Sequence, residues 1–146
     1  MKVLKIALAS DHAGFEKKEL VKNHLSKLGI ETNDFGAYST ESTDYADWAH
    51  PMANAVESGL FPIGISLCGS GNGINMTVNK HQGIRSALCW TPEIASLAVQ
   101  HNNANILAIP ARFLSDEETI QIIDSFLNAE FEGGRHLIRI NKIPLK

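Results

Sequence analysis

The chain has few cysteines, no basic excess and no long apolar run. Its 146 residues include only two cysteines, Cys68 and Cys89, which cannot make the disulfide framework of a small secreted domain. Asp and Glu (16) outnumber Lys and Arg (13), which excludes the strong positive charge usual in nucleic-acid-binding and membrane-surface proteins. No run reaches the length of a membrane span, and the apolar N-terminal run is shorter than a signal sequence requires. We therefore expect a cytoplasmic protein whose partners include neither nucleic acid nor a membrane.

The composition of the chain is that of one globular domain. Hydrophobic residues make up 44% of the chain, which is enough to build a core in a domain of this length. No internal repeat, low-complexity tract or linker divides the sequence. We expect a single domain over residues 1–146.

Strand and helix patterns alternate along the chain. The hydrophobic periods predict strands at 3–9, 30–35, 63–67, 84–89 and 105–109, and helices at 15–28, 43–59, 74–81, 92–102 and 116–127. Alternation with short connections implies a mainly parallel five-stranded sheet with helices on both faces, a three-layer Rossmann-like α/β sandwich. A helical tail follows, in which Arg135 and Arg139 are spaced i, i+4 on one face.

The most informative segment is the end of the third predicted strand. Its apolar residues end at Cys68, and glycines follow at positions 69, 71 and 73. Glycine allows positive φ and close approach to a ligand, and the N–H groups of the following helix would face that ligand. The same helix dipole favours the thiolate form of Cys68. The spacing differs from the dinucleotide fingerprint and from the P-loop, so it predicts an anion cradle beside a reactive sulfur rather than an ATP site.

Both cysteines have a simpler interpretation, because free cysteine is among the most buried residue types. The position of Cys68 at a strand end beside three glycines favours a functional role. Cys89 lies inside an apolar strand, and we interpret it as a packing residue.

Other polar residues also fall where ligands bind in such sheets, beyond the carboxyl ends of the strands. Asp11 and His12 follow the first strand, and Arg112 follows the last one. Asp11 could instead cap the helix that begins near residue 14. His101 and Asn102 end a predicted helix, where a helix cap and a turn former are the alternative to catalysis.

The sequence offers candidate residues for a phosphate site but no local set of ligands for a metal site. The guanidinium groups of Arg112, Arg135 and Arg139 match a phosphate dianion if they converge, although ordinary ion pairs on a solvated face explain them equally well. No His-x-x-x-His or Cys-x-x-Cys pair occurs, so the sequence offers no local ligand set. We predict chemistry without a metal or another cofactor.

Seven separated blocks together resemble the type B ribose-5-phosphate isomerase family, which also includes galactose-6-phosphate isomerase subunits. The blocks are residues 10–14, 43–45, 68–74, 79–80, 83–85, 101–102 and 132–136. The resemblance spans essentially the whole chain. It implies an aldose-ketose isomerase of the pentose phosphate pathway that interconverts ribose 5-phosphate and ribulose 5-phosphate without a metal. It also implies a homodimer or a dimer of dimers whose active sites are shared between subunits.

The resemblance assigns roles to individual residues. It makes Cys68 the base that moves a proton between C1 and C2, and His101 the acid/base that opens the furanose ring. Ser70, counted with the catalytic residues, stands where many members have threonine. The implied binding residues are Asp11, His12 and Tyr45 for the sugar, the loop Gly69, Ser70, Gly71, Asn72 and Gly73, Asn102 for a hydroxyl, and Arg112, Arg135 and Arg139 for the phosphate. The loop N–H groups would stabilise the enediolate.

Two other functions stay open at this point. The same chemistry could serve a six-carbon substrate such as galactose 6-phosphate or allose 6-phosphate, because one carbon is a matter of side-chain reach. A non-catalytic sugar-phosphate-binding module could use the same sheet. The presence of both Cys68 and His101 argues against the module, since binding alone needs neither a thiolate nor a ring-opening group.

Overall fold

One five-stranded sheet forms the centre of the molecule, and all its neighbouring strands are parallel. The computed structural model describes residue 3 and residues 5–145. The strands are β1 (Lys5–Ser10), β2 (Glu31–Asp34), β3 (Ile63–Cys68), β4 (Ser86–Leu88) and β5 (Ile106–Pro110), in the order β2-β1-β3-β5-β4. The register pairs Ser10 with Leu67 and Cys68 with Pro110, so β1, β3 and β5 end side by side at the centre of the sheet.

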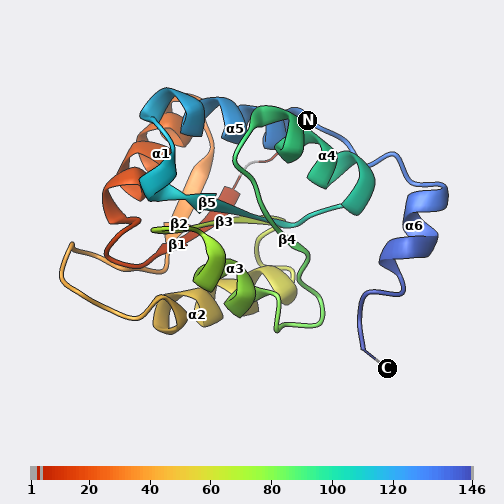
Figure 1. The fold of residues 1–146 in the computed structure, drawn as a ribbon, viewed down its shortest axis with the longest axis horizontal. Coiled ribbons are helices and arrows are strands. Elements are labelled where there is room, and N and C mark those ends of the chain that lie inside the picture. The colour runs from red at the N-terminus through yellow and green to blue at the C-terminus, as the bar shows by residue number, and fades with distance from the viewer. Residues whose placement is uncertain (1–2, 4, 146) are drawn as a thin grey trace.

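Helices cover both faces of the sheet (Figure 1). The helices are α1 (Phe15–Lys27), α2 (Tyr45–Glu57), α3 (Asn72–Val78), α4 (Pro92–Asn102), α5 (Asp116–Asn128) and α6 (Arg135–Ile140), with a 3-10 turn η1 (Ala111–Phe113). α1, α4 and α5 form one layer, α2 and α3 form the other, and α6 lies beyond α4 at the right of the view. Within the described residues, no helix combines the length and the apolar character needed to cross a membrane.

The alternation of side chains along β1 explains the two layers. Ile6 and Leu8 pack in the larger apolar cluster with the α1, α4 and α5 helices, and Ala7 and Ala9 pack in the second cluster with α2 and α3. All four are fully buried. A parallel sheet buried on both faces needs such continuous apolar runs, and this is the pattern from which the strands were predicted.

The predicted α/β sandwich with a parallel sheet and a helical tail is confirmed, and the differences lie at element ends. The first strand starts at Lys5, and Leu4 lies outside the described residues. β4 is shorter than predicted because it is an edge strand whose Ser86 exchanges backbone hydrogen bonds with the Asn79 side chain. α3 begins two residues earlier than predicted, after Gly71 with φ 78°. Asp44 precedes α2, without a side-chain cap hydrogen bond.

Candidate active site

The carboxyl ends of β1, β3 and β5 bring three predicted site segments to one edge of the sheet. The backbone N–H of Asp11 donates to the Leu67 carbonyl (3.3 Å), and the N–H of Arg112 donates to the Gly69 carbonyl (3.0 Å). These bonds connect the segments after β1 and β5 directly to the Cys68 loop. A ligand at this edge would meet all three segments.

The glycine loop after Cys68 is shaped by close contacts. Gly71 has φ 78°, a region that favours glycine, and ends the loop where α3 begins. A Cβ on Gly73 would lie 2.5 Å from Cζ of Tyr45, so the ring of Tyr45 packs directly on the loop. Asn72 donates its backbone N–H to Oγ of Ser70 (3.3 Å).

The loop offers hydrogen-bond donors beside a thiol. Among the described residues, none accepts a hydrogen bond from the backbone N–H of Gly69, Ser70 or Gly71. Cys68 belongs to the apolar cluster on the α2 and α3 side of the sheet, and the residue is only 4% exposed. Free N–H groups next to a sheltered sulfur can bind a group that develops negative charge.

Asp11 and His12 are held in place by different neighbours. Oδ1 of the buried Asp11 accepts a hydrogen bond from the backbone N–H of Gly14 (3.0 Å), the N-cap residue of α1, so Asp11 braces the turn before the helix without being its cap. The backbone N–H of Thr43 donates to Nδ1 of His12 (3.2 Å), and the Thr43 carbonyl lies at the same distance from that nitrogen. This contact turns the other ring nitrogen, Nε2, away from Thr43.

His12 and Arg112 line one cleft of about 620 Å³. Its wall also includes Lys17, whose Nζ donates to Asp116 at 2.8 Å. Glu16 also lines the cleft and Lys17 is paired with Asp116, so an anionic group such as a phosphate would meet mainly Arg112 and His12 here. The Arg112 side chain also lies close to Gly69, where a Cβ would be 3.3 Å from its Nη1. The cleft therefore adjoins the Cys68 loop.

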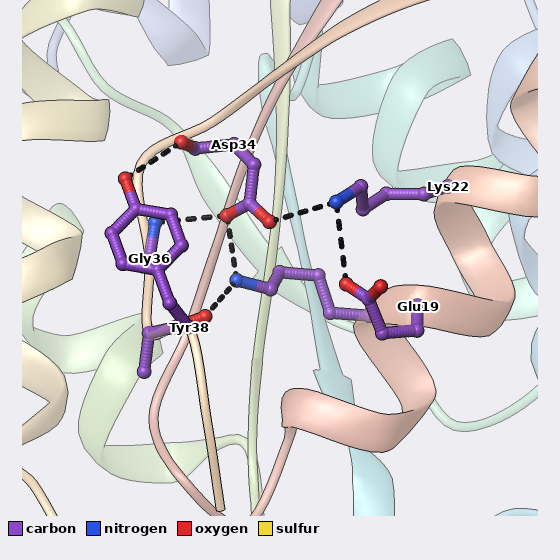
Figure 2. A network of polar contacts seen from close by, with 7 residues as sticks. Glu19, Lys22, Asp34, Gly36 and Tyr38 are labelled. Atoms are coloured by element: carbon purple, nitrogen blue, oxygen red, sulfur yellow. Dashed lines mark hydrogen bonds and ion pairs between the residues drawn. The ribbon is translucent and has the colours of Figure 1, made fainter.

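A network of polar contacts around Asp34 joins α1 to the chain that follows β2 (Figure 2). Lys18 is fully buried, and its Nζ donates to Oδ1 of Asp34 (2.6 Å) and to the Ala37 carbonyl (2.5 Å). Asp34 also accepts from the Gly36 N–H (2.8 Å) and from Lys22 Nζ (3.2 Å). The network fixes the chain after β2, which runs on to Thr43. Nothing in the sequence pattern marked this lysine, and residues 43–45 entered only as one block of the resemblance, with no role for Thr43 in holding His12.

The pKa values of the two lysines in this network shift in opposite directions. Burial lowers the pKa of Lys18, and the Asp34 carboxylate offsets only part of that effect. For Lys22 desolvation also acts to lower the pKa, but hydrogen bonds from its ammonium to Asp34 and Glu19 outweigh it, so the pKa is raised. The buried lysine is thus the member of the pair whose charge the fold tolerates least.

The remaining predicted residues gather around the end of α4 and the tail. The rings of His101 and His136 stack with centroids 4.4 Å apart. Oε1 of Glu132 lies 3.7 Å from Nε2 of His101 and 3.5 Å from Nε2 of His136. Asn102 lines a separate pocket of about 350 Å³. Glu132 and His136 belong to the block 132–136 of the resemblance, and their i, i+4 spacing is the local sequence signal for this cluster.

This second group lies at the opposite edge of the sheet from Cys68. Asn105 donates to the Arg85 carbonyl and accepts from the Gly64 N–H, so the end of α4 lies near the amino ends of the strands. Gly64 and Cys68 are four residues apart in β3, which corresponds to about 13 Å. Figure 1 shows α6 at the right and the loop between β2 and α2 at the left.

The predicted site residues therefore form two sets within one chain. Arg112 belongs to the Cys68 edge, whereas Arg135 and Arg139 lie on the exposed tail helix. A converging arginine trio is not formed by one chain, because a helix that follows a strand runs back antiparallel to it and ends at the opposite edge. Sequence spacing alone does not show this separation.

Three comparisons with known proteins agree on one family. The family model described as Ribose/Galactose Isomerase matches residues 6–143. The chain is 42% identical over 139 residues to ribose-5-phosphate isomerase B of Escherichia coli, with 95% of this chain and 93% of that protein covered. A crystal structure of a ribose 5-phosphate isomerase from Thermotoga maritima superposes with a TM-score of 0.95 at 50% identity, covering 97% of each chain. Ribose-5-phosphate isomerase B from Mycoplasma genitalium with bound ribulose-5-phosphate gives 0.91 at 42% identity, covering 95% of this chain and 93% of that one.

Proposed function

The chain belongs to the ribose/galactose isomerase family, and from this membership and its site we infer that it is an isomerase that interconverts ribose 5-phosphate and ribulose 5-phosphate. The observation that carries the inference is the loop after Cys68, whose backbone N–H groups at residues 69–71 have no acceptor among the described residues and which adjoins the cleft lined by His12 and Arg112. The similar proteins named for a substrate are ribose-5-phosphate isomerases, and one holds the pentose product, so a hexose phosphate is not the favoured substrate.

The proton transfer is assigned to Cys68. In the open-chain aldose, the thiolate takes the proton from C2 and returns it at C1, while the hydroxyl proton moves from O2 to O1. The intermediate enediolate carries negative charge on oxygen, and the N–H groups of Gly69, Ser70 and Gly71 are placed to stabilise it. Each well-aimed donor supplies about 3 kcal/mol. A positioned base contributes roughly 10²–10⁴-fold, so the loop is the larger effect.

Substrate binding is assigned to the same edge of the sheet. Asp11, His12 and Tyr45 hold the sugar, and Arg112 receives the phosphate in the cleft. Ser70 contributes its hydroxyl and Asn72 its backbone N–H to sugar binding, and these two groups are hydrogen-bonded to each other at 3.3 Å. Thr43 fixes the ring of His12, and the Lys18 network fixes the segment that leads to Thr43.

We further propose a homodimer in which two chains complete each site, either alone or within a dimer of dimers. His101, Asn102, Arg135 and Arg139 lie at the far edge of their own chain, so they serve a site only when they meet the Cys68 edge of a partner. Leu137 and Ile138 on α6 are 46% and 64% exposed, and exposed apolar side chains of this kind mark interfaces. A two-fold axis would bring the Cys68 edge of each chain against the His101 edge of the other, which gives two equivalent sites per dimer.

The chemistry also favours a reducing compartment for the enzyme. Cys68 and Cys89 are both free thiols. The proposed base is active only as an unoxidised thiol, and such thiols persist in the cytoplasm. We therefore propose a cytoplasmic enzyme.

The test is a direct isomerase assay with a solvent-exchange readout. The protein is given ribose 5-phosphate, galactose 6-phosphate and allose 6-phosphate in turn, and kcat/KM is measured together with solvent deuterium incorporation at C1 of the ketose product and at C2 of the re-formed aldose. We expect the highest kcat/KM on the pentose and deuterium in its sugar. Binding without exchange would instead indicate a non-catalytic module, and a clear hexose preference would overturn the assigned substrate. Cys68→Ser should abolish both signals, with Cys89→Ser as the matched control.

A further inference from the structure

We propose that His101, Glu132 and His136 form a binding site for one divalent first-row transition metal ion such as Zn²⁺, and that the ion inhibits the enzyme. One ring nitrogen from each histidine and one carboxylate oxygen all lie within 4.8 Å of one another. Two imidazoles and a carboxylate are a ligand set that binds Zn²⁺ and leaves one coordination position open. Sequence spacing alone does not predict this site, because His101 is distant in the chain from Glu132 and His136.

The distances between the ligand atoms are close to those around a bound metal ion, and the one movement needed is a ring rotation. Ligand atoms around a tetrahedral zinc ion are about 3.4 Å apart, given bonds of about 2.0–2.2 Å. Glu132 Oε1 already lies 3.5 and 3.7 Å from the two Nε2 atoms. The stacked imidazoles differ by 12° in plane, so one ring must turn for both lone pairs to converge. His101, with its side chain 39% exposed, has room to turn, whereas that of His136 is 9% exposed and stays fixed.

A second observation points to a ligand at this position. Nε2 of His136 is buried and has no hydrogen-bond partner among the described residues. A buried polar atom without a partner is costly, and ligation of a cation would relieve that cost. This nitrogen is aimed at Glu132 Oε1, the atom that also faces His101.

The backbone holds the three ligands in register. The N–H of Glu132 donates to the Gln100 carbonyl (3.0 Å), which ties the tail to the last turn of α4 next to His101. The N–H of His136 donates to the Gly133 carbonyl (3.1 Å) at the start of α6. Arg135 and Arg139 are exposed, so their charges are solvated and oppose a cation here only weakly.

Imidazole ligands favour zinc, copper and nickel over magnesium or calcium, so the ion is one of the former. The inhibition rests on the proposed function, because a metal-bound His101 has no free Nε2 with which to open the sugar ring. The site itself does not depend on that function. Metal binding and isomerase activity are therefore measured separately.

The test measures Zn²⁺ affinity of the metal-stripped full-length protein by competition with a chromophoric chelator. We expect one Zn²⁺ per chain, and at least tenfold weaker binding in Glu132→Gln and in His136→Gln. His24→Gln is the matched control, since His24 also pairs with a carboxylate, Asp124 at 2.7 Å, and should retain wild-type affinity. All measurements are repeated with Cys68→Ser, which removes the thiol as a competing ligand. Equal affinity in all variants would overturn the site.

Two further readouts separate the possible failures. Co²⁺ loaded into the protein should give the intense visible absorption of a tetrahedral site, and Glu132→Gln, at an exposed position, should lose it while its circular dichroism stays that of the wild type. Zn²⁺ should inhibit the wild-type isomerase, and EDTA should restore activity. Stoichiometric binding without inhibition would overturn the inhibitory role and count against His101 in catalysis. Failure to bind with normal isomerase activity would overturn the metal site alone.

Discussion

Removal of the Asp34 carboxylate should destabilise the fold far more than removal of a comparable exposed carboxylate. Asp34→Ala leaves the ammonium of Lys18 fully buried, with the Ala37 carbonyl as its remaining hydrogen-bond acceptor among the described residues. Breaking a buried ion pair from one side costs about 3–5 kcal/mol, because the remaining charge is uncompensated. That is a large share of the roughly 5–15 kcal/mol by which a domain of this kind is stable.

Asp116→Ala is the matched control, because Asp116 pairs with Lys17, the residue before Lys18 in α1. Lys17 Nζ donates to Asp116 at 2.8 Å, but the side chain of Asp116 is 73% exposed. Asp116→Ala should therefore cost less than about 1 kcal/mol. The two substitutions remove the same chemical group and differ in the burial of the lysine that loses its partner.

A double-mutant cycle isolates the pair itself. Lys18→Met fills similar space without a charge, and in that background Asp34→Ala should cost at least about 1 kcal/mol less than in the wild type. The assay is urea unfolding followed by circular dichroism at one fixed protein concentration, since assembly would make stability depend on concentration. Additive costs, or equal costs for Asp34→Ala and Asp116→Ala, would refute the reasoning.

Three further predictions concern pH, thiol reactivity and the loop. Burial lowers the pKa of Lys18, so between that lowered value and its ordinary 10.5 the unfolded chain binds more protons than the folded one. The unfolding free energy of the wild type, relative to that of Lys18→Met, should therefore rise with pH across this window. A difference that does not change with pH would contradict the prediction. Burial raises the pKa of Cys89 to about 12, so iodoacetamide at pH 8 should modify only Cys68. This modification should abolish activity, and ribose 5-phosphate should protect against it. Alkylated Cys89 in the folded protein, detected by mass spectrometry, would refute the prediction. A Cβ at residue 73 would lie 2.5 Å from the Tyr45 ring, so Gly73→Ala should lower kcat/KM at least about tenfold. In a Tyr45→Ala background the same change should have little further effect on kcat/KM, and an equal loss there would exclude the ring as the cause.

Most of the fold was predictable because a parallel sheet buried on both faces has a distinctive pattern. The apolar runs of β3 and β5 and the helical spacing of α5 each carry that pattern locally. The edge strand β4 was less predictable, since the Asn79 side chain replaces part of its strand pairing. Element ends of this kind depend on contacts with residues distant from the strand's own pattern.

The site was predictable only as a list of residues. Cys68 ends a strand and Asp11 and Arg112 come just after strands, so their common edge was inferred from topology alone. Thr43 and Lys18 act through contacts 31 and 19 residues away, to His12 and Ala37, which no local spacing reveals. The separation of His101 from Cys68 likewise depends on the direction of α4 relative to the strands.

The proposal that two chains share each active site is tested most directly by subunit complementation. Cys68→Ser and His101→Asn proteins, each inactive alone, are mixed under conditions that allow subunit exchange, and ribose 5-phosphate isomerisation is measured. In a mixed dimer one site carries both lesions and the other carries neither, so random exchange should restore about a quarter of wild-type activity. No recovery, in mixtures whose exchange is verified by native mass spectrometry, would contradict shared sites and require Cys68 and His101 to act within one chain.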